Sequence, residues 1–297
     1  MGLASQGKRM SGIADFRLRP GDFRPVGREL SRPECIVAER DGTLWVSDNR
    51  AALMRIDPDG TQALIGAMRG APNGFAMEAD GSFLVANIEQ GRFYRQHRDG
   101  RHEVALDTWE GAALGSANFA YRDPQGRMWA TISTRTVPRS NAVHATIPDG
   151  FVLCRTNGNW RLAAGGFCFT NEVRLLGEYL YVAETARGRV VRLEVSGERL
   201  GPMQPYGPDP LFPGAKVDGI TFDAEGNLWV TEITRNALIV ISREQRAHAV
   251  FEDPEGKSLL MPTSITFAGP EARTALVGSL KMDHLAAFTA PFPGQAL

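Results

Sequence analysis

A single pattern recurs along this chain at intervals that few folds produce. Each copy has a polar residue, a short β-branched or apolar run, a tight turn that usually contains glycine, and then Leu-Trp-Val or an equivalent. The six copies, of which the last is the weakest, begin at Glu34, Asn73, Asn118, Asn171, Asp218 and Thr263. Their spacings of 39, 45, 53, 47 and 45 residues match the repeat of about 40 to 50 residues that is typical of β-propeller blades.

The repeat predicts the fold class and the domain organisation. Six copies in 297 residues indicate an all-β six-bladed β-propeller, with four-stranded antiparallel blades around a central channel. Length alone suggests about two domains, but a closed ring uses the whole chain, so we expect one domain over residues 1–297. We expect the N-terminal segment 1–28 to contribute to blade closure. Trp45, Trp129 and Trp229 occupy equivalent positions in their copies, which places them in the core.

Composition excludes several classes of function. Lys and Arg number 33 against 34 Asp and Glu, a net charge of −1, so no bulk positive field exists to bind nucleic acid. No run of 18 apolar residues is present to span a membrane. Three widely spaced cysteines and a polar N-terminus without a secretion signal indicate reduced thiols and a cytoplasmic protein. A small-molecule ligand is the remaining class of partner, and no sequence feature fixes an oligomeric state.

The six leading residues are expected to meet at the channel. The first strand of each blade lines the channel of a propeller, so equivalent positions converge on one axis. Buried polar groups need partners, and both ordered water and a bound cation supply them. Two carboxylates with amide oxygens form a hard-oxygen set that suits Ca²⁺ or Mg²⁺. The residues alone leave a water-filled channel and a metal site equally open.

At these residues the sequence resembles the senescence-marker-protein/gluconolactonase family, the regucalcin-like six-bladed lactonases. The resemblance extends from about residue 29 to residue 288. The family binds one divalent cation through a Glu of blade one, an Asn of blade four and an Asp of blade five, which fall on Glu34, Asn171 and Asp218. The resemblance therefore implies one divalent cation, Ca²⁺ first and Mg²⁺, Mn²⁺ or Zn²⁺ as alternatives. The blade-three Asn that lies near metal and substrate falls on Asn118.

The resemblance implies a metal-dependent hydrolase that opens a lactone ring with metal-activated water. A divalent cation would polarise the lactone carbonyl and stabilise the oxyanion. Asp218 would then ligate the metal and take a proton from the attacking water, or act as a ligand only. Two alternatives stay open: a metal-assisted lyase, isomerase or condensing enzyme on the same scaffold, and a non-catalytic binding or scaffold propeller.

The chain departs from the family pattern near the site. Phe119 stands where the family has an Asp after the blade-three Asn, and Ser116 stands where it commonly has an Arg. Both changes favour a substrate less polar than a sugar lactone. Glu172 stands where the family has Gly, and it is a candidate for contact with substrate, with a solvated loop charge as the alternative. Asn73 heads blade two and could equally be a turn residue or a substrate contact.

The longest interval between copies contains a polar segment with proline, over residues 133–150. It interrupts the blade rhythm and indicates an extended loop that could cover the channel mouth. Arg135, Arg139 and His144 in this loop could meet a carboxylate of the substrate or supply a proton. A solvated loop without such a role is the alternative.

Overall fold

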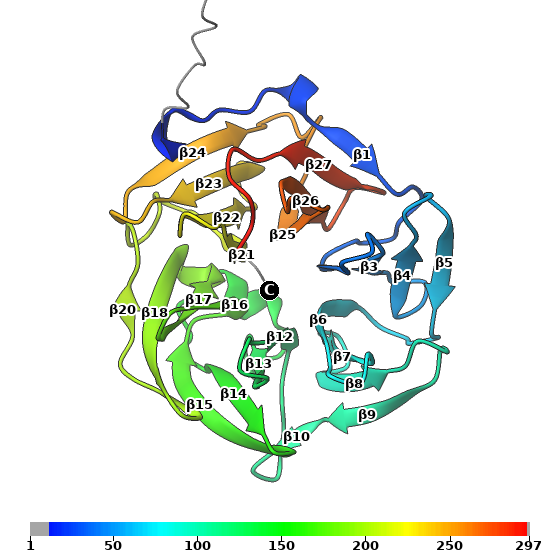
Figure 1. Ribbon diagram of the computed structural model, residues 1–297. Helices are drawn as coiled ribbons and strands as arrows, with labels where there is room; N and C mark the ends of the chain where they lie inside the picture. Colours follow the sequence, from blue (N-terminus) through cyan, green and yellow to red (C-terminus); the bar gives the residue numbers. More distant parts are fainter. Residues whose placement is uncertain (1–11, 296–297) are drawn as a thin grey trace, which may run out of the picture.

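The computed structural model describes residues 12–295. Six small antiparallel sheets stand around a central channel (Figure 1), which confirms the predicted six-bladed propeller. The strands of each blade are ordered from an inner strand at the channel to an outer strand. No helix in this range is long and apolar enough to cross a membrane.

The strands of the first three blades follow the chain in order. They are β2 (Ile36–Ala38), β3 (Leu44–Ser47), β4 (Leu53–Ile56) and β5 (Gln62–Ile65) in blade one; β6 (Pro72–Met77), β7 (Phe83–Asn87), β8 (Arg92–Gln96) and β9 (His102–Leu106) in blade two; and β12 (Ala117–Arg122), β13 (Met128–Ile132), β14 (Gly150–Thr156) and β15 (Asn159–Phe167) in blade three.

The remaining blades continue the same pattern. They contain β16 (Thr170–Leu176), β17 (Tyr179–Glu184), β18 (Arg189–Ser196) and β20 (Gln204–Pro205) in blade four; β21 (Val217–Phe222), β22 (Leu228–Glu232), β23 (Ala237–Ile241) and β24 (Ala247–Glu252) in blade five; and β25 (Pro262–Ala268), β26 (Thr274–Ser279), β27 (Leu285–Thr289) and β1 (Arg24–Val26) in blade six.

The shorter elements lie before β1 or in the connections between the strands. They are η1 (Ile13–Asp15), η2 (Pro20–Asp22), β10 (Thr108–Trp109), β11 (Ala112–Ala113), α1 (Ser140–Val143), η3 (Thr185–Arg187) and β19 (Arg199–Leu200). The N-terminal strand β1 pairs with β27 and becomes the outer strand of blade six. The ring therefore closes with strands from both ends of the chain.

The three blade tryptophans are buried, with at most 1% of each side chain exposed, as predicted. Each indole N–H donates to an acidic side chain six residues earlier. The pairs are Trp45 with Glu39 (2.6 Å), Trp129 with Asp123 (2.8 Å) and Trp229 with Asp223 (3.1 Å). The turn between the acid and the tryptophan uses glycine at positive φ, for example +94° at Gly42, a conformation that glycine adopts without strain.

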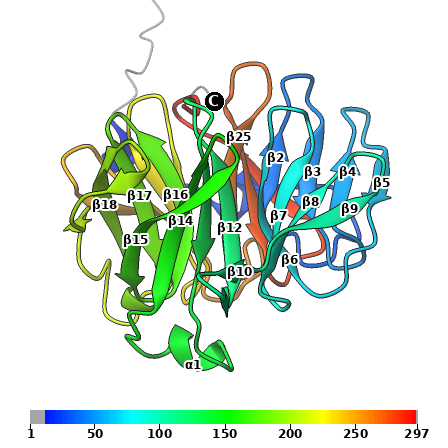
Figure 2. The ribbon, with the colours of Figure 1, turned by 90° about the horizontal axis from the view of Figure 1, so that it is seen from below.

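The two faces of the propeller carry different segments. The inner strands start at the face that we call the mouth face, and α1 projects from it (Figure 2). The opposite face, the rear face, holds the turns that follow the inner strands. The end of the described chain crosses the rear face, where the Gln295 amide donates to the carbonyl of Phe222 at the end of β21 (3.0 Å).

Candidate active site at the mouth of the channel

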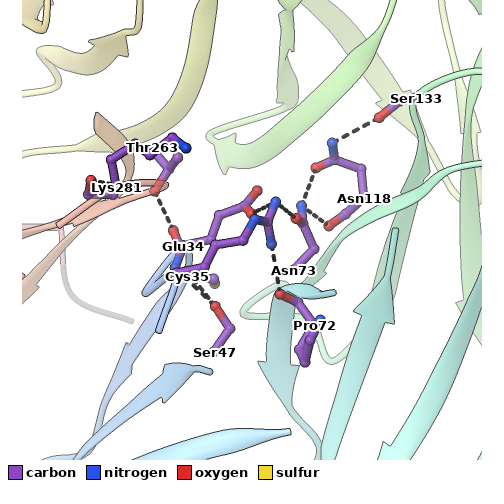
Figure 3. Close-up of polar contacts among 11 residues, drawn as sticks. Glu34, Cys35, Ser47, Pro72, Asn73, Asn118, Ser133, Thr263 and Lys281 are labelled. Carbon is purple, nitrogen blue, oxygen red and sulfur yellow. Dashed lines mark hydrogen bonds and ion pairs between the residues drawn. The ribbon is translucent and has the colours of Figure 1, made fainter. Parts of the chain in front are cut away.

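The six leading residues form a ring at the mouth end of the channel. Glu34 lies two residues before β2, and each of the others is the second residue of its inner strand. Every member is at most 6% exposed. In Figure 3 the side chains of Glu34, Asn73, Asn118 and Thr263 lie close together at the channel. The prediction that these positions converge is therefore confirmed by the propeller geometry.

Local irregularities in the inner strands accompany this placement. The pairing register shifts at the leading residue in five blades, for example between Val217 and Ile220 in β21. Such a bulge bends a strand and re-aims a side chain. Close backbone packing then holds the ring: a Cβ on Gly219 would lie 2.3 Å from the Thr263 carbonyl oxygen, and one on Gly278 would lie 2.7 Å from that of Glu34.

Three of the ring members have their polar atoms bound by protein neighbours. The Asn73 amide donates to the backbone carbonyl (3.0 Å) and the side-chain oxygen (3.3 Å) of Asn118. Asn118 donates to the Ser133 hydroxyl (2.8 Å), which donates to the Thr170 carbonyl (2.9 Å). The Thr263 hydroxyl donates to the carbonyl of Glu34 (2.7 Å). These side chains tie neighbouring blades together.

Two of the other three ring members, Glu34 and Asn171, keep a side-chain oxygen without a hydrogen bond among the described residues, and the third, Asp218, has its carboxylate beside the Asn171 side chain. Glu34 Oε2 is buried and accepts no hydrogen bond within residues 12–295, although it forms an ion pair with Arg32. The Asn171 amide nitrogen donates to the Thr185 hydroxyl (3.0 Å), which leaves its oxygen available. These are the three positions at which the family resemblance places metal ligands.

The two ring carboxyl groups are electrostatically strained. Burial raises the pKa of Glu34, and the positive charges of Arg32 and Arg139 counter only part of that effect. Burial raises the pKa of Asp218 well above its usual value, and the charges of Glu34 and Glu172 add to the rise. Two buried carboxylates that repel each other need a positive charge to ionise together.

The donor set fits a hard divalent cation. Two carboxylates and one amide oxygen are ligands that Ca²⁺ and Mg²⁺ accept, and the buried Glu34 Oε2 has an ion pair with Arg32 but no hydrogen bond among the described residues. No group of three or more His, Cys, Asp or Glu side chains arranged to hold a metal occurs among residues 12–295. The candidate centre therefore rests on two acids and an amide, with room for water or substrate oxygens as further ligands.

Glu172 lies inside the channel and not on a solvated loop. Its side chain is 3% exposed, it pairs with Arg174 (3.1 Å), and it accepts the backbone N–H of Ile220 (3.2 Å). Burial raises its pKa to about 7, against the opposing charge of Arg174. The solvated-charge alternative for Glu172 is therefore wrong, whereas its contact with substrate stays a prediction.

The loop over residues 133–149 is anchored across the mouth face. The Asp149 carboxylate accepts the hydroxyls of Thr134 (2.7 Å) and Thr136 (2.9 Å) and so closes the base of the loop. Lys216, which precedes the inner strand of blade five, donates to the Val143 carbonyl of α1 (2.5 Å). The loop, which belongs to blade three, thus also contacts blade five.

The predicted loop residues differ in how they relate to the ring. Arg135 is exposed and stacks on Phe151, with 4.9 Å from guanidinium carbon to ring centre. His144 is also exposed. Arg139 is half-buried, and its charge lowers the pKa of Glu34. Among these three, Arg139 is the residue whose charge reaches the ring.

Phe119 belongs to a different part of the channel from Asn118. A cavity of about 760 Å³ opens toward the rear face and is lined by Phe119, Tyr121, Phe75 and Arg174, among others. Arg174 stacks over the rings of Phe119 (4.9 Å) and Tyr121 (5.4 Å). The ring acids do not line this cavity, so the cavity and the candidate chemistry lie at opposite ends of the channel.

Sequence reasoning missed Arg32, the nearest cation to the ring. Its guanidinium donates to the Asn73 side-chain oxygen (2.8 Å) and to the Pro72 carbonyl (3.1 Å), and it pairs with Glu34. Arg32 stands outside the repeat, and its backbone has φ of +56°. The one available signal was its position two residues before a predicted ligand.

Comparison with known proteins agrees with this fold. The model of the SMP-30/Gluconolactonase/LRE-like region matches residues 32–281, whereas no curated protein matches in sequence. A gluconolactonase from Xanthomonas campestris superposes with a TM-score of 0.74 and 17% identity over 91% of this chain and 89% of that one. A calcium-binding regucalcin from Agrobacterium tumefaciens gives 0.71 and 18% over 92% and 93%.

A more distant likeness exists to a catalytically inactive virginiamycin B lyase from Staphylococcus aureus, with a TM-score of 0.60 and 18% identity over 86% of this chain and 80% of that one. Identities this low show a shared propeller and leave the reaction undetermined. The family model is stronger, because it spans the whole ring of leading residues from Glu34 to Thr263. The chain belongs to the SMP-30/gluconolactonase/LRE-like family.

Proposed function

We propose that this protein is a metal-dependent lactone hydrolase whose active site is the mouth-face ring. The observation that carries the proposal is the contrast within the ring: Glu34 and Asn171 keep a side-chain oxygen without a hydrogen bond, next to the buried carboxylate of Asp218, while the other members are bound to neighbours. Family membership supports lactonase-type hydrolysis as the class of reaction. The regucalcin likeness supports Ca²⁺ as the first candidate ion.

In this proposal Glu34, Asn171 and Asp218 hold the cation, which supplies polarisation of the lactone carbonyl and stabilisation of the oxyanion. Asp218 is the base that takes a proton from the attacking water, because it is a buried member of the ring and burial raises its pKa well above its usual value. Asn118 and Asn73 position the substrate beside it. The loop that carries α1 shields the mouth, and Arg139 orients the substrate from above.

The substrate in this proposal is less polar than a sugar lactone. The amides of Asn73 and Asn118 bind each other, and Arg32 and Ser133 occupy further atoms of the pair. Few donors and acceptors are then left to recognise several hydroxyl groups. Phe119 gives this point no support, since its ring lines the rear cavity.

The test is a lactone panel on metal-stripped protein. Aliphatic, aromatic and sugar lactones are assayed with and without added Ca²⁺, beside thermal melting under the same conditions. We expect turnover to require the ion, and an ion at 100 times its Kd to stabilise the fold by about 2.7 kcal/mol. If chelation changes neither melting nor turnover and no ion is retained, the metal site is wrong.

Two further outcomes separate the parts of the proposal. Ring opening of gluconolactone as fast as the best lactone tested would refute the less polar substrate. A bound ion with no turnover on any lactone would favour a metal-assisted lyase or isomerase in place of a hydrolase.

A further inference from the structure

We infer that Arg32 is a tethered cation that occupies Glu34 in the metal-free protein and leaves it when a divalent cation binds. This inference rests on the proposed metal site. It assigns to Arg32 a role in setting metal affinity that is separate from catalysis.

The contacts of Arg32 place it in the ring. Its side chain is 18% exposed, and its guanidinium reaches one charged and two neutral acceptors: the Glu34 carboxylate, the Asn73 amide oxygen (2.8 Å) and the Pro72 carbonyl (3.1 Å). Glu34 Oε2 has this ion pair and no hydrogen bond of good geometry within the described chain. The charge of Arg32 is thus the main counterweight to burial at Glu34.

The strained backbone at Arg32 indicates that the guanidinium at this position has a role. Its φ is +56°, a left-handed conformation that glycine adopts readily and other residues adopt at a cost. Arg32 also precedes Pro33, and a residue in that place is normally extended. The segment is held by the Ser31 N–H on Asp48 (3.0 Å) and the Asn49 N–H on the Ser31 carbonyl (2.9 Å). A glycine would relieve the strain, but it would carry no charge to Glu34.

A guanidinium and a divalent cation compete for the same carboxylate oxygen. Both are cations, and both need the lone pairs of Glu34 Oε2. When the ion binds, Arg32 gives up Glu34 but can keep the neutral acceptors on blade two, Asn73 and Pro72. The ion pair therefore competes with the metal, and the metal-free ring is stabilised by a charge of the chain's own.

The experiment is a calorimetric titration of Ca²⁺ into chelator-treated protein at one pH and ionic strength. Wild type is compared with Arg32→Gln, and with Arg50→Gln as a matched control. Arg50 also pairs with a buried acid of blade one, Asp48 (2.7 Å), but stands outside the ring. We expect Arg32→Gln to bind Ca²⁺ roughly 10- to 100-fold more tightly and to melt at a lower temperature than wild type when metal-free. Arg50→Gln should melt lower with unchanged Ca²⁺ affinity.

A second variant guards against loss of folding. Arg32→Gly removes the guanidinium at a position where glycine is unstrained, so it should fold and show the same gain in affinity. Unchanged or weaker Ca²⁺ binding in both Arg32 variants, with normal binding in wild type, overturns the inference and leaves the proposed function intact. If no divalent cation binds to wild type or to either variant, the metal site fails and the inference fails with it.

Discussion

Blade five buries an acidic side chain at each end of its inner strand β21, and the two acids differ in their surroundings. At the rear face, Asp223 is 1% exposed and accepts hydrogen bonds from the Glu225 and Asn227 amides (3.0 and 2.9 Å) and from the indole of Trp229 (3.1 Å). At the mouth face, Asp218 is 6% exposed, and its pKa is raised by burial and by neighbouring carboxylates. The two carboxylates are thus similarly buried, but Asp223 accepts several hydrogen bonds whereas Asp218 lies among other carboxylates.

This difference separates stabilising acids from functional ones. An acid whose oxygens are filled by backbone and side-chain donors strengthens the fold and has nothing left to offer a ligand. An acid that is buried without donors costs stability and persists where chemistry requires it. The number of hydrogen bonds that a buried carboxylate accepts, more than its burial, therefore predicts whether it takes part in function. We call an acid whose oxygens accept such hydrogen bonds a satisfied acid.

The matched substitutions Asp218→Asn and Asp223→Asn test this comparison most strongly. Asp218→Asn removes the proposed base and a metal ligand, so kcat should fall on the order of a thousandfold, while the metal-free fold keeps or gains stability because carboxylate repulsion is relieved. Asp223→Asn sets an amide nitrogen against buried donors and should cost about 3 kcal/mol of unfolding free energy. Lactone turnover and urea unfolding of both variants are the measurements.

Turnover should be expressed per folded molecule, because a destabilised variant loses activity trivially. Asp223→Asn should then match wild type. If Asp218→Asn destabilised the metal-free protein as much as Asp223→Asn does, Asp218 would be a structural acid and the comparison between the two ends would collapse.

The repeat explains why the ring could be predicted and the rear acids could not. Each leading residue precedes a hydrophobic run at a fixed place in its copy, so blade symmetry converts sequence position into spatial position. At the rear turn of blade one, the acid-glycine pair Asp41-Gly42 is the visible signal, but the Trp45 indole binds Glu39. Which acid accepts the indole N–H depends on how the turn folds back over the strand.

Residues outside the repeat were beyond such reasoning. Arg32 reaches the ring through a left-handed backbone, and Lys216 reaches α1 through contact between distant segments. The repeat pattern of the sequence predicts neither of these two contacts. Phe119 shows the same limit: it adjoins Asn118 in the chain, but its ring lines the rear cavity while Asn118 lies in the mouth-face ring.

The pH dependence of stability gives a smaller effect that also separates the two kinds of buried acid. Glu172 titrates near 4.5 when unfolded and at about 7 in the fold. Between these values the folded chain binds more protons than the unfolded chain, so metal-free stability should fall as pH rises from about 5 to about 7. Glu172→Gln should flatten this slope. Urea unfolding with chelator across this range is the measurement.

The satisfied acids should give the opposite slope. At Glu78, burial works to raise the pKa, but the hydrogen bonds and charges of Arg95 and Arg155 outweigh it and the pKa is lowered. Its contribution is present above the unfolded pKa of about 4.5 and is lost as pH falls below it. Glu78→Gln should therefore reduce the loss at acid pH and leave the slope above about pH 5 unchanged. If Glu172→Gln and Glu78→Gln changed the pH dependence of stability in the same way, the distinction between satisfied and unsatisfied acids would be contradicted.

Asp149 gives the smallest effect and the most specific test, since it is a satisfied acid on the mouth face. It accepts the Thr134 and Thr136 hydroxyls and the Arg135 amide (3.0 Å), and it is only partly buried. If satisfaction rather than location marks a structural acid, Asp149→Asn should cost about 1 kcal/mol and change kcat by less than about threefold. KM should rise modestly, because the loop that carries Arg139 loses part of its anchor. A loss of kcat comparable to that of Asp218→Asn would mean that the mouth face itself, and not the open oxygens within it, defines the functional acids.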